Sequence, residues 1–411
     1  MGNLTKAEVV CMRREYLSPS LRTFEAYDET MVLERGRGVR LWDSEGNEYV
    51  DCLGQNLCVS VGYGREDIHD VALRQMEKLP HCTTMYYHEE PARLAKEIVK
   101  KIPAHPSGED WVIHFVNTGS EAVDLAVQMA RAYTGRSETI GLYKAYHGLQ
   151  GYAAGLTAIG KATQPCYSGM FSGVHHVKAN KIEELEDTVK YGTGGKVASM
   201  IMEPLQGYGG IHSLEPGYMK EAFRLIEEAG GVTISDEVQT GYGRCGESFW
   251  GFEMQHNDVV PDMITMGKGM GNGSAIIGAV ACRRSIAEAF TSKMFFNTYG
   301  SNPVACAVAR RVLQIMNDEA IIQNCRMQGN WMNSKIKDLC VKYPSIYKEI
   351  RGSGLFQGLE IAGENKVESQ KKAYELHKDL LDHGVILGRG SAEGNVFRLQ
   401  PPMCITQLEV S

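Results

Sequence analysis

Two short apolar segments, each followed by a chemically active side chain, most constrain how this chain can fold. The first, residues 232–237, ends in the two adjacent carboxylates Asp236 and Glu237, and the second, residues 263–266, leads into Gly267-Lys268-Gly269. Such runs are typical of buried strands in a parallel sheet, whose carboxyl ends form the ligand-binding edge of open α/β folds. A lysine and a carboxylate at one edge predict a carbonyl cofactor, bonded to Lys268 and with its ring charge held by Asp236. Because a lone Gly-Lys-Gly is more often a solvated turn, this prediction depends on the rest of the chain.

The order of segments between residues 112 and 269 predicts an α/β fold. Strand-like runs at 112–116, 140–143 and 197–202 alternate with helix-like periodicity after residue 119 and over 217–229. This alternation is typical of a parallel sheet covered by helices.

The two ends of the chain have other patterns. Residues 31–53 predict a β-meander with turns at 36–38 and 44–47, preceded by an arm or short helix. A helix is expected over Pro91–Ile102, with Pro91 at its first position. After residue 303 the pattern changes to compact α+β. We therefore expect a large domain over 51–303, and a small domain made of 304–411 together with the arm and meander of 1–50.

Composition excludes several classes of function. The 411 residues are 43% hydrophobic and 23% charged, as in an ordinary globular protein, and the net charge of −7 gives no support for nucleic-acid binding. No apolar run approaches membrane-spanning length, and the eleven cysteines contain no C-x-x-C pair. The N-terminus lacks a secretory core, and its basic residues are interrupted by acidic ones, so no clear transit peptide is present. A cytoplasmic or an organellar protein both fit.

Residues 117–121, Asn-Thr-Gly-Ser-Glu, join an expected strand to an expected helix. At a helix start, Gly119 and Ser120 would present free backbone N–H groups and a hydroxyl to an anion such as phosphate. The alternative, in which Ser120 only caps its own helix, fits this segment equally well.

Tyr146 and His147 follow the next expected strand. Tyr146 would either stack on a planar cofactor ring or pack in the core. His147 has no second ligand at metal spacing, and the adjacent His175 and His176 would point to opposite faces of a strand. No metal site is expected.

Residues 241–246, Gly-Tyr-Gly-Arg-Cys-Gly, match the dinucleotide-binding fingerprint G-x-G-x-x-G letter for letter. The following Glu-Ser-Phe-Trp-Gly does not open a helix, which that fingerprint requires. Binding of a nicotinamide cofactor is therefore not expected.

Taken together, these segments resemble the class III aminotransferases, which have fold type I and use pyridoxal 5′-phosphate. The resemblance covers almost the whole chain. It is most specific at residues 236–241 (Asp-Glu-Val-Gln-Thr-Gly) and at Gly267-Lys268. Within the class, the runs at 117–122, 145–148, 297–300 and 402–406 are most similar to the mitochondrial alanine–glyoxylate aminotransferase 2 subfamily. The resemblance implies a mostly parallel seven-stranded sheet with a smaller α+β domain.

The resemblance also implies a role for each residue around the cofactor. Lys268 would bind the cofactor and then move the substrate proton, while Asp236 would pair with the ring nitrogen. The remaining cofactor residues would be Tyr146 stacked on the ring, His147 beside it, Gln239 at the ring hydroxyl, Glu203 behind the ring, and Gly119 and Ser120 at the phosphate.

Substrate and subunit contacts follow in the same way. Arg398 would bind the substrate carboxylate through a bidentate pair, with Asn56 and Leu57 at the mouth of the pocket. Thr298 would reach the phosphate of the partner subunit, which implies a homodimer or a higher homo-oligomer.

The resemblance implies ping-pong transfer of an amino group from alanine, or from a β- or ω-amino acid such as 3-aminoisobutyrate, to glyoxylate or pyruvate. It places the protein in the mitochondrial matrix, with the cytoplasm as the alternative. Relatives that act on ornithine have a glutamate where this chain has Tyr208, so ornithine-type chemistry is not expected. Relatives continue past Thr406 with a final helix, and we expect that helix to be shortened here.

A rival interpretation is a phospho-lyase acting on phosphoethanolamine or phosphohydroxylysine, since such lyases share the lysine–aspartate pair. Arg398 favours the transaminase, because relatives whose substrates lack an α-carboxylate tend to have lost this arginine. A non-enzymatic relic is a weaker alternative, because all the residues needed for catalysis are present.

Overall fold

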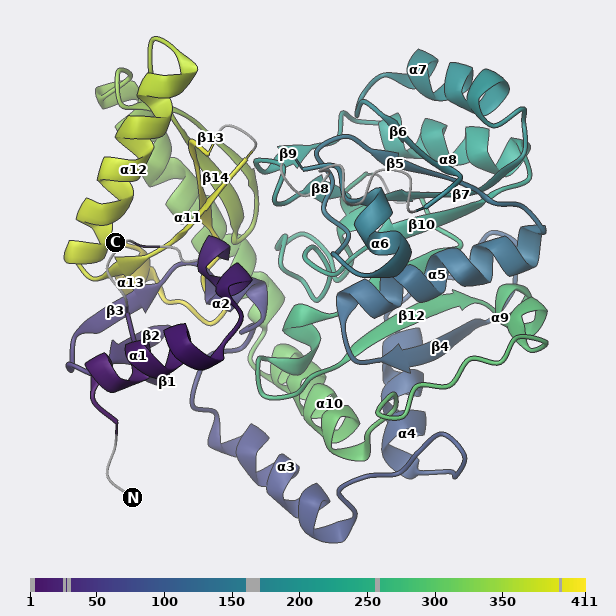
Figure 1. The fold of residues 1–411 in the computed structure, drawn as a ribbon, viewed down its shortest axis with the longest axis horizontal. Coiled ribbons are helices and arrows are strands. Elements are labelled where there is room, and N and C mark those ends of the chain that lie inside the picture. Colours follow the sequence, from purple (N-terminus) through teal and green to yellow (C-terminus); the bar gives the residue numbers. More distant parts are fainter. Residues whose placement is uncertain (1–3, 25–26, 28–30, 160–170, 256–258, 392–393) are drawn as a thin grey trace.

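The computed structural model describes residues 4–24, 27, 31–159, 171–255, 259–391 and 394–411. Figure 1 shows two groups of elements. The first and last parts of the chain, purple and yellow, lie together on one side, and residues of the middle of the chain, blue and teal, lie on the other. Within the described residues, no helix combines the length and apolarity needed to cross a membrane.

The largest sheet has seven strands and is mostly parallel, as expected. Its single antiparallel strand is β12, which runs opposite to both of its neighbours. The order across the sheet is β4 (Trp111–Val116), β12 (Gly278–Arg283), β11 (Met263–Met266), β10 (Val232–Asp236), β7 (Val197–Met202), β5 (Glu138–Leu142) and β6 (Val174–Val177).

Two neighbouring strands of this sheet bring the two key segments together. Every residue of β10 and β11 is buried, including the polar side chains of Thr233, Ser235 and Thr265, so both faces of these strands are covered. The parallel register pairs Asp236 with Thr265, so β10 and β11 end side by side. The segment that carries Lys268 therefore leaves the sheet beside Asp236.

Helix α5 (Gly119–Thr134) packs across this sheet (Figure 1). Its side chains Ala122, Leu125, Ala126 and Met129 are buried in a cluster that includes residues of β4, β7, β10, β11 and β12. These positions recur at helical spacing, so one stripe of the helix faces the strands. The other helices of this part are α3 (Glu66–Lys78), α4 (Glu89–Val99), α6 (Gly151–Leu156), α7 (Ile182–Asp187), α8 (Tyr218–Glu228), α9 (Arg284–Phe290) and α10 (Pro303–Asp318).

The C-terminal part contains a four-stranded antiparallel sheet with helices α11 (Ile321–Lys342) and α12 (Lys366–Asp382). Its strand order is β13 (Tyr347–Ser353), β14 (Phe356–Ile361), β17 (Val396–Leu399) and β16 (Gly388–Gly390). Beyond it, Thr406 and Glu409 form a capping box at the start of α13 (Gln407–Val410), where a helix start was expected.

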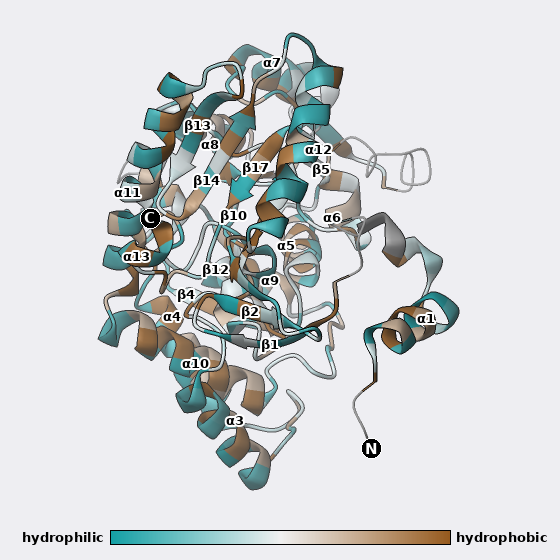
Figure 2. Ribbon diagram, turned by 90° about the vertical axis from the view of Figure 1, so that its left-hand side faces the viewer, coloured by the Kyte–Doolittle hydropathy of each residue, from teal (hydrophilic) through white to brown (hydrophobic). Residues whose placement is uncertain are grey.

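The N-terminal meander joins this C-terminal part through a shared sheet. Its strands β1 (Leu33–Arg37), β2 (Arg40–Asp43) and β3 (Glu48–Asp51) are followed in the sheet by β15 (Val385–Ile386), which runs parallel to β3. Helix α1 (Lys6–Tyr16) lies outside it; none of its residues is buried, and in Figure 2 it stands at the edge of the molecule. The domain boundaries at residues 50 and 303 remain a prediction.

Two local expectations were wrong. The turn expected at 36–38 is shorter: β1 continues to Arg37, and Gly38, with φ of 60°, begins the two-residue connection to β2. Helix α4 begins at Glu89 instead of Pro91, because the ring nitrogen of His88 accepts a hydrogen bond from the Glu90 amide and caps the helix earlier.

Candidate active site

A cavity of about 150 Å³ lies at the carboxyl edge of the large sheet. Eight of the residues expected around a cofactor line it: Gly119, Ser120, Tyr146, His147, Glu203, Asp236, Gln239 and Lys268. They come from segments that follow β4, β5, β7, β10 and β11, so the sheet edge gathers them. Four further residues, Thr118, Gly148, Val238 and Thr240, also line the cavity. They lie in the sequence runs that carry the resemblance, but no role was expected for them.

Lys268 begins the short turn that follows β11, and its own φ is 42°. Left-handed backbone in a non-glycine residue is unusual and is found at functional sites more often than elsewhere. Burial lowers the pKa of the Lys268 amine, whereas the negative charges of Asp236 and Glu203 oppose this shift. The lowered pKa increases the neutral fraction of the amine, the form that can attack a carbonyl or accept a proton.

Asp236 is held by three hydrogen bonds and is only 3% exposed. Its Oδ2 lies 2.6 Å from Nδ1 of the buried His147, and its Oδ1 accepts bonds of 3.1 Å from Thr265 Oγ1 and from the Val238 amide. Because the partners fix both oxygens, the carboxylate has a single orientation. The Nε2 atom of His147 has no partner among the described residues.

The start of helix α5 decides between the two interpretations of Ser120. The N-cap is Thr118, whose Oγ1 accepts from the Glu121 amide at 3.1 Å. Ser120 is therefore not the cap, and its side chain lines the cavity. The helix dipole and the first amides of α5 favour an anion at this point.

Gly148 allows the chain to pass close to Ser120. A Cβ atom on Gly148 would lie 2.2 Å from Ser120 Oγ, and the φ of Gly148 is 121°. Only glycine adopts this conformation readily and leaves the hydroxyl undisturbed.

Glu203 and Gln239 complete the polar wall of the cavity. Glu203 accepts hydrogen bonds from the backbone amides of Tyr146 (2.9 Å) and Gly207 (3.0 Å), so it fixes the segment that carries the Tyr146 ring. Burial raises the pKa of Glu203 to about 7. The side-chain oxygen of Gln239 is buried without a partner in the described part of the chain, which leaves it able to accept from a ligand hydroxyl.

Arg398 lies outside the lining of this cavity but is connected to it through Tyr208. Its guanidinium stands 5.6 Å from the centre of the Tyr208 ring, and that ring stands 5.7 Å from the ring of Tyr146. Arg398 is 7% exposed, and its Nη2 donates to Asn56 Oδ1 at 3.1 Å. Leu57, next to Asn56, is buried.

Thr298 is exposed and does not line the cavity of its own chain. The preceding residue, Asn297, is tied to this region: its Oδ1 accepts from the side-chain Nδ2 of Asn117 at 2.9 Å, and its Nδ2 donates to Glu121 Oε2 at 3.3 Å.

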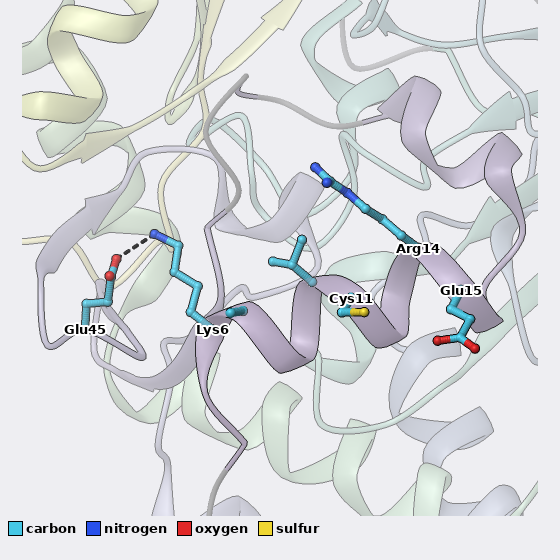
Figure 3. A pocket seen from close by; sticks show the side chains of 7 residues that line it. Lys6, Cys11, Arg14, Glu15 and Glu45 are labelled. Carbon is cyan, nitrogen blue, oxygen red and sulfur yellow. Dashed lines mark hydrogen bonds and ion pairs between the residues drawn. The ribbon is translucent and has the colours of Figure 1, made fainter.

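Several other features carry no comparable chemistry. A larger hollow of about 790 Å³ lies beside α1 (Figure 3). Its lining includes the ion pair between Lys6 and Glu45 together with Ala7, Val10, Cys11, Arg14 and Glu15. His175 pairs with Glu138 at 2.6 Å, while His176 bonds to the Leu156 carbonyl. In the part of the chain that the structure describes, no three His, Cys, Asp or Glu residues are grouped to hold a metal.

Comparison with known proteins extends these observations. The model of the family described as aminotransferase class-III matches residues 24–411. The chain is 34% identical to "alanine--glyoxylate aminotransferase 2 homolog 2, mitochondrial" from Arabidopsis thaliana, over 97% of this chain and 84% of that protein. Among solved structures, it is similar to a Bacillus anthracis aminotransferase (28% identity, 100% and 97% of the chains, TM-score 0.87). It is also similar to a phospholyase from Arthrobacter in complex with phosphoethanolamine (26% identity, 98% and 96% of the chains, TM-score 0.88).

Proposed function

The chain belongs to the class III aminotransferase family, and from this premise we propose that it transfers the amino group of alanine, or of a β- or ω-amino acid such as 3-aminoisobutyrate, to glyoxylate or pyruvate. Membership makes the protein a transaminase of fold type I that uses pyridoxal 5′-phosphate. The choice of substrates and the roles of individual residues are our inference.

The cavity fits this cofactor in three respects. The start of α5 and the Ser120 hydroxyl suit its phosphate, the unpartnered Gln239 oxygen suits its ring hydroxyl, and the fixed Asp236 carboxylate suits its ring nitrogen. When bound, the cofactor supplies an electron-withdrawing ring that makes the proton on the amino-bearing carbon of the substrate acidic.

The residues of this chain then perform the remaining tasks. We infer that Asp236 holds a proton at the ring nitrogen, which keeps the ring electron-withdrawing. Lys268 Nζ accepts the substrate proton and returns it, a role favoured by the lowered pKa of its amine. Tyr146 would cover one face of the ring and exclude water from it. The kinetics should be ping-pong, because the first product would have to leave the cavity before the acceptor binds to the enzyme form that holds the amino group.

One observation supports an amino acid as the substrate. Arg398 is a buried guanidinium, and among the described residues no carboxylate lies within ion-pairing distance of it. A buried cation without an anionic partner favours an anionic ligand, and the arginine fork suits a carboxylate.

The test is a visible spectrum of purified protein with pyridoxal 5′-phosphate before and after addition of L-alanine alone. We expect the absorbance of the bound cofactor near the visible region to fall, with one pyruvate formed per site, and glyoxylate to restore it. If alanine leaves the spectrum unchanged under conditions in which the cofactor is bound, the proposed donor is wrong.

The phospho-lyase is the second candidate, and the similarity to the Arthrobacter phospholyase supports it. Phosphoethanolamine has no carboxylate, so in a lyase Arg398 would have only the phosphate group of this substrate as an anionic partner. Release of inorganic phosphate from phosphoethanolamine by the same sample, with no pyruvate from alanine, would favour the lyase.

We further propose that the protein acts as a homodimer in the mitochondrial matrix. The exposed Thr298 supports the dimer, since it lies outside its own cavity and is free to reach the phosphate of a partner subunit. The Arabidopsis relative is named as a mitochondrial protein, which supports the mitochondrial location.

A further inference from the structure

Residues 54–57 form a left-handed turn, which is rare for residues other than glycine. The φ angles of Gly54, Gln55, Asn56 and Leu57 are 59°, 49°, 58° and 64°. Left-handed backbone is unfavourable for L-residues, so consecutive residues adopt it only where the surroundings impose it.

The surroundings of this turn are well defined. The buried carboxylate of Asp51 accepts from the amides of Leu53 at 2.8 Å and Gly54 at 2.9 Å. The Gly54 carbonyl accepts from the Val59 amide at 3.0 Å. The turn is therefore anchored at both ends, and Asn56 is held at a fixed point above the C-terminal sheet.

In this position the Asn56 side chain contacts Arg398. Its Oδ1 accepts from Arg398 Nη2 at 3.1 Å, across 342 positions of sequence. On the other side, Tyr208 presents its ring to the guanidinium at 5.6 Å, and its carbonyl accepts from the Ser391 amide at 3.1 Å. Both contacts orient the guanidinium without neutralising it.

Two glycines of β16 leave the space that Arg398 occupies. The register pairs Gly388 with Arg398, and a Cβ atom on Gly388 would lie 2.9 Å from both Nε and Nη2 of the arginine and 2.6 Å from Leu53 Cδ1. A Cβ atom on Gly390 would lie 3.1 Å from Arg398 Cδ. The arginine side chain therefore lies across β16, and any larger residue at position 388 would collide with both Arg398 and Leu53.

We propose that the left-handed turn and Gly388 position Arg398, and that Asn56 is the residue that restricts the pocket to substrates with a carboxylate. This inference rests on the proposed function. Asn56 supplies a neutral acceptor, so the guanidinium is oriented while its charge is left for the substrate. An acidic residue at position 56 would neutralise the charge and reduce the need for a substrate carboxylate.

The first test is Asn56→Asp, compared with Asn56→Gly. Aspartate tolerates left-handed backbone and places a carboxylate at the Asn56 oxygen, whereas glycine keeps the turn and removes the side chain. We expect Asn56→Asp to raise KM for both L-alanine and glyoxylate about tenfold to a hundredfold, the worth of a charge-assisted contact, with kcat changed less. Asn56→Gly should raise both KM values only a few-fold.

The second readout uses isopropylamine, which is alanine with a methyl group in place of the carboxylate. Its half-reaction, followed by the loss of cofactor absorbance, should be faster relative to that of alanine in Asn56→Asp than in the wild-type protein. Equal KM values in Asn56→Asp and Asn56→Gly, or an unchanged preference between the two amines, would overturn the proposal.

Gly388→Ala tests the space below the arginine independently. We expect a rise in KM for both carboxylate substrates of about tenfold or more, with cofactor absorbance close to that of the matched variant Gly192→Ala. Gly192 is exposed, and an added Cβ would make only an ordinary contact of 3.4 Å with Thr188. Unchanged KM values in Gly388→Ala would contradict the positioning role.

These outcomes are distinct from a failure of the proposed function. If the wild-type protein does not convert alanine at all, the proposed function is wrong before any variant is measured. If the wild-type protein converts alanine and the variants do not shift KM, only the inference about Asn56 and Gly388 fails.

Discussion

The Nδ1 atom of His147 lies 2.6 Å from Oδ2 of Asp236, and both side chains are buried. A histidine nitrogen that donates to a carboxylate holds it in one orientation and stabilises its negative charge. We expect Asp236→Asn to lower kcat about 10²- to 10³-fold, the usual effect of removing an electrostatic partner of the reacting group.

Loss of His147 should have a smaller effect of the same kind. His147→Leu removes one charge-assisted hydrogen bond, so we expect kcat to fall about tenfold to a hundredfold while KM for alanine changes little. His147→Asn, whose side-chain amide is able to donate to Asp236, should retain more activity than His147→Leu. If both variants lose the same activity, or if KM rises in parallel, the histidine does not act through the orientation of Asp236.

Gly148→Ala should weaken cofactor binding. The added Cβ would lie 2.2 Å from Ser120 Oγ and would push the hydroxyl away from the phosphate position. We expect the Kd for pyridoxal 5′-phosphate, measured by absorbance titration, to rise about tenfold to a hundredfold. The matched control is Gly194→Ala, at a φ of 60° with nothing within 4 Å, which carries backbone strain without the collision. A similar Kd in both variants would show that backbone strain, and not the displaced hydroxyl, is responsible.

The raised pKa of Glu203 predicts a dependence of stability on pH in the cofactor-free protein. Burial raises this pKa from its ordinary value of 4.5 to about 7, so between these values the folded protein holds a proton that the unfolded chain has released. The free energy of unfolding therefore falls as pH rises through this range, by up to roughly 3 kcal/mol from this group.

Glu203→Gln provides the measurement, because glutamine does not titrate in this range. Urea unfolding of both proteins at pH 5 and pH 8 should show that the difference in unfolding free energy moves in favour of Glu203→Gln at the higher pH. A difference that is the same at both pH values would mean that Glu203 has an ordinary pKa in the folded protein.

The strands that meet at the site were predictable because each is a short run, rich in apolar and β-branched residues, that leads into a chemically active side chain. Met263–Met266 has the expected bounds, and β10 ends at Asp236, one residue before the expected end at Glu237. The parallel register then places Asp236 near the segment that carries Lys268. Strands of a parallel sheet that are buried on both faces are usually rich in apolar residues, which makes them recognisable in a sequence. The gathering of residues at the sheet edge follows from topology alone.

The contacts between distant segments were not predictable. His147 and Asp236 are 89 positions apart, and Asn56 and Arg398 are 342 apart, so neither pair leaves a local pattern. The left-handed turn at residues 54–57 has a glycine only at its first position, so the local sequence does not predict left-handed backbone at the next three residues, where the buried Asp51 anchors the turn. The start of α4 was predicted at the wrong residue because its N-cap is a histidine, which is not among the usual capping residues.

Substitution of Thr298 tests whether each cofactor site is built from two subunits. If it contacts the phosphate of the partner subunit, the cofactor site of one chain depends on Thr298 of the other. Thr298→Asp would place a negative charge against the phosphate, so we expect the homogeneous variant to bind pyridoxal 5′-phosphate at least about tenfold more weakly. Lys268→Ala alone should be inactive, because the lysine that moves the proton is absent.

Co-expression of these two variants with different affinity tags gives mixed dimers. In a mixed dimer, the subunit that keeps Lys268 would receive an unaltered Thr298 from its partner, so one of the two sites should be complete. We expect the purified mixed dimer to recover up to about half of the wild-type activity, since one site in two is intact. If the mixed dimer is no more active than the two parents, Thr298 acts within its own chain or not at all, and the proposed shared site is wrong.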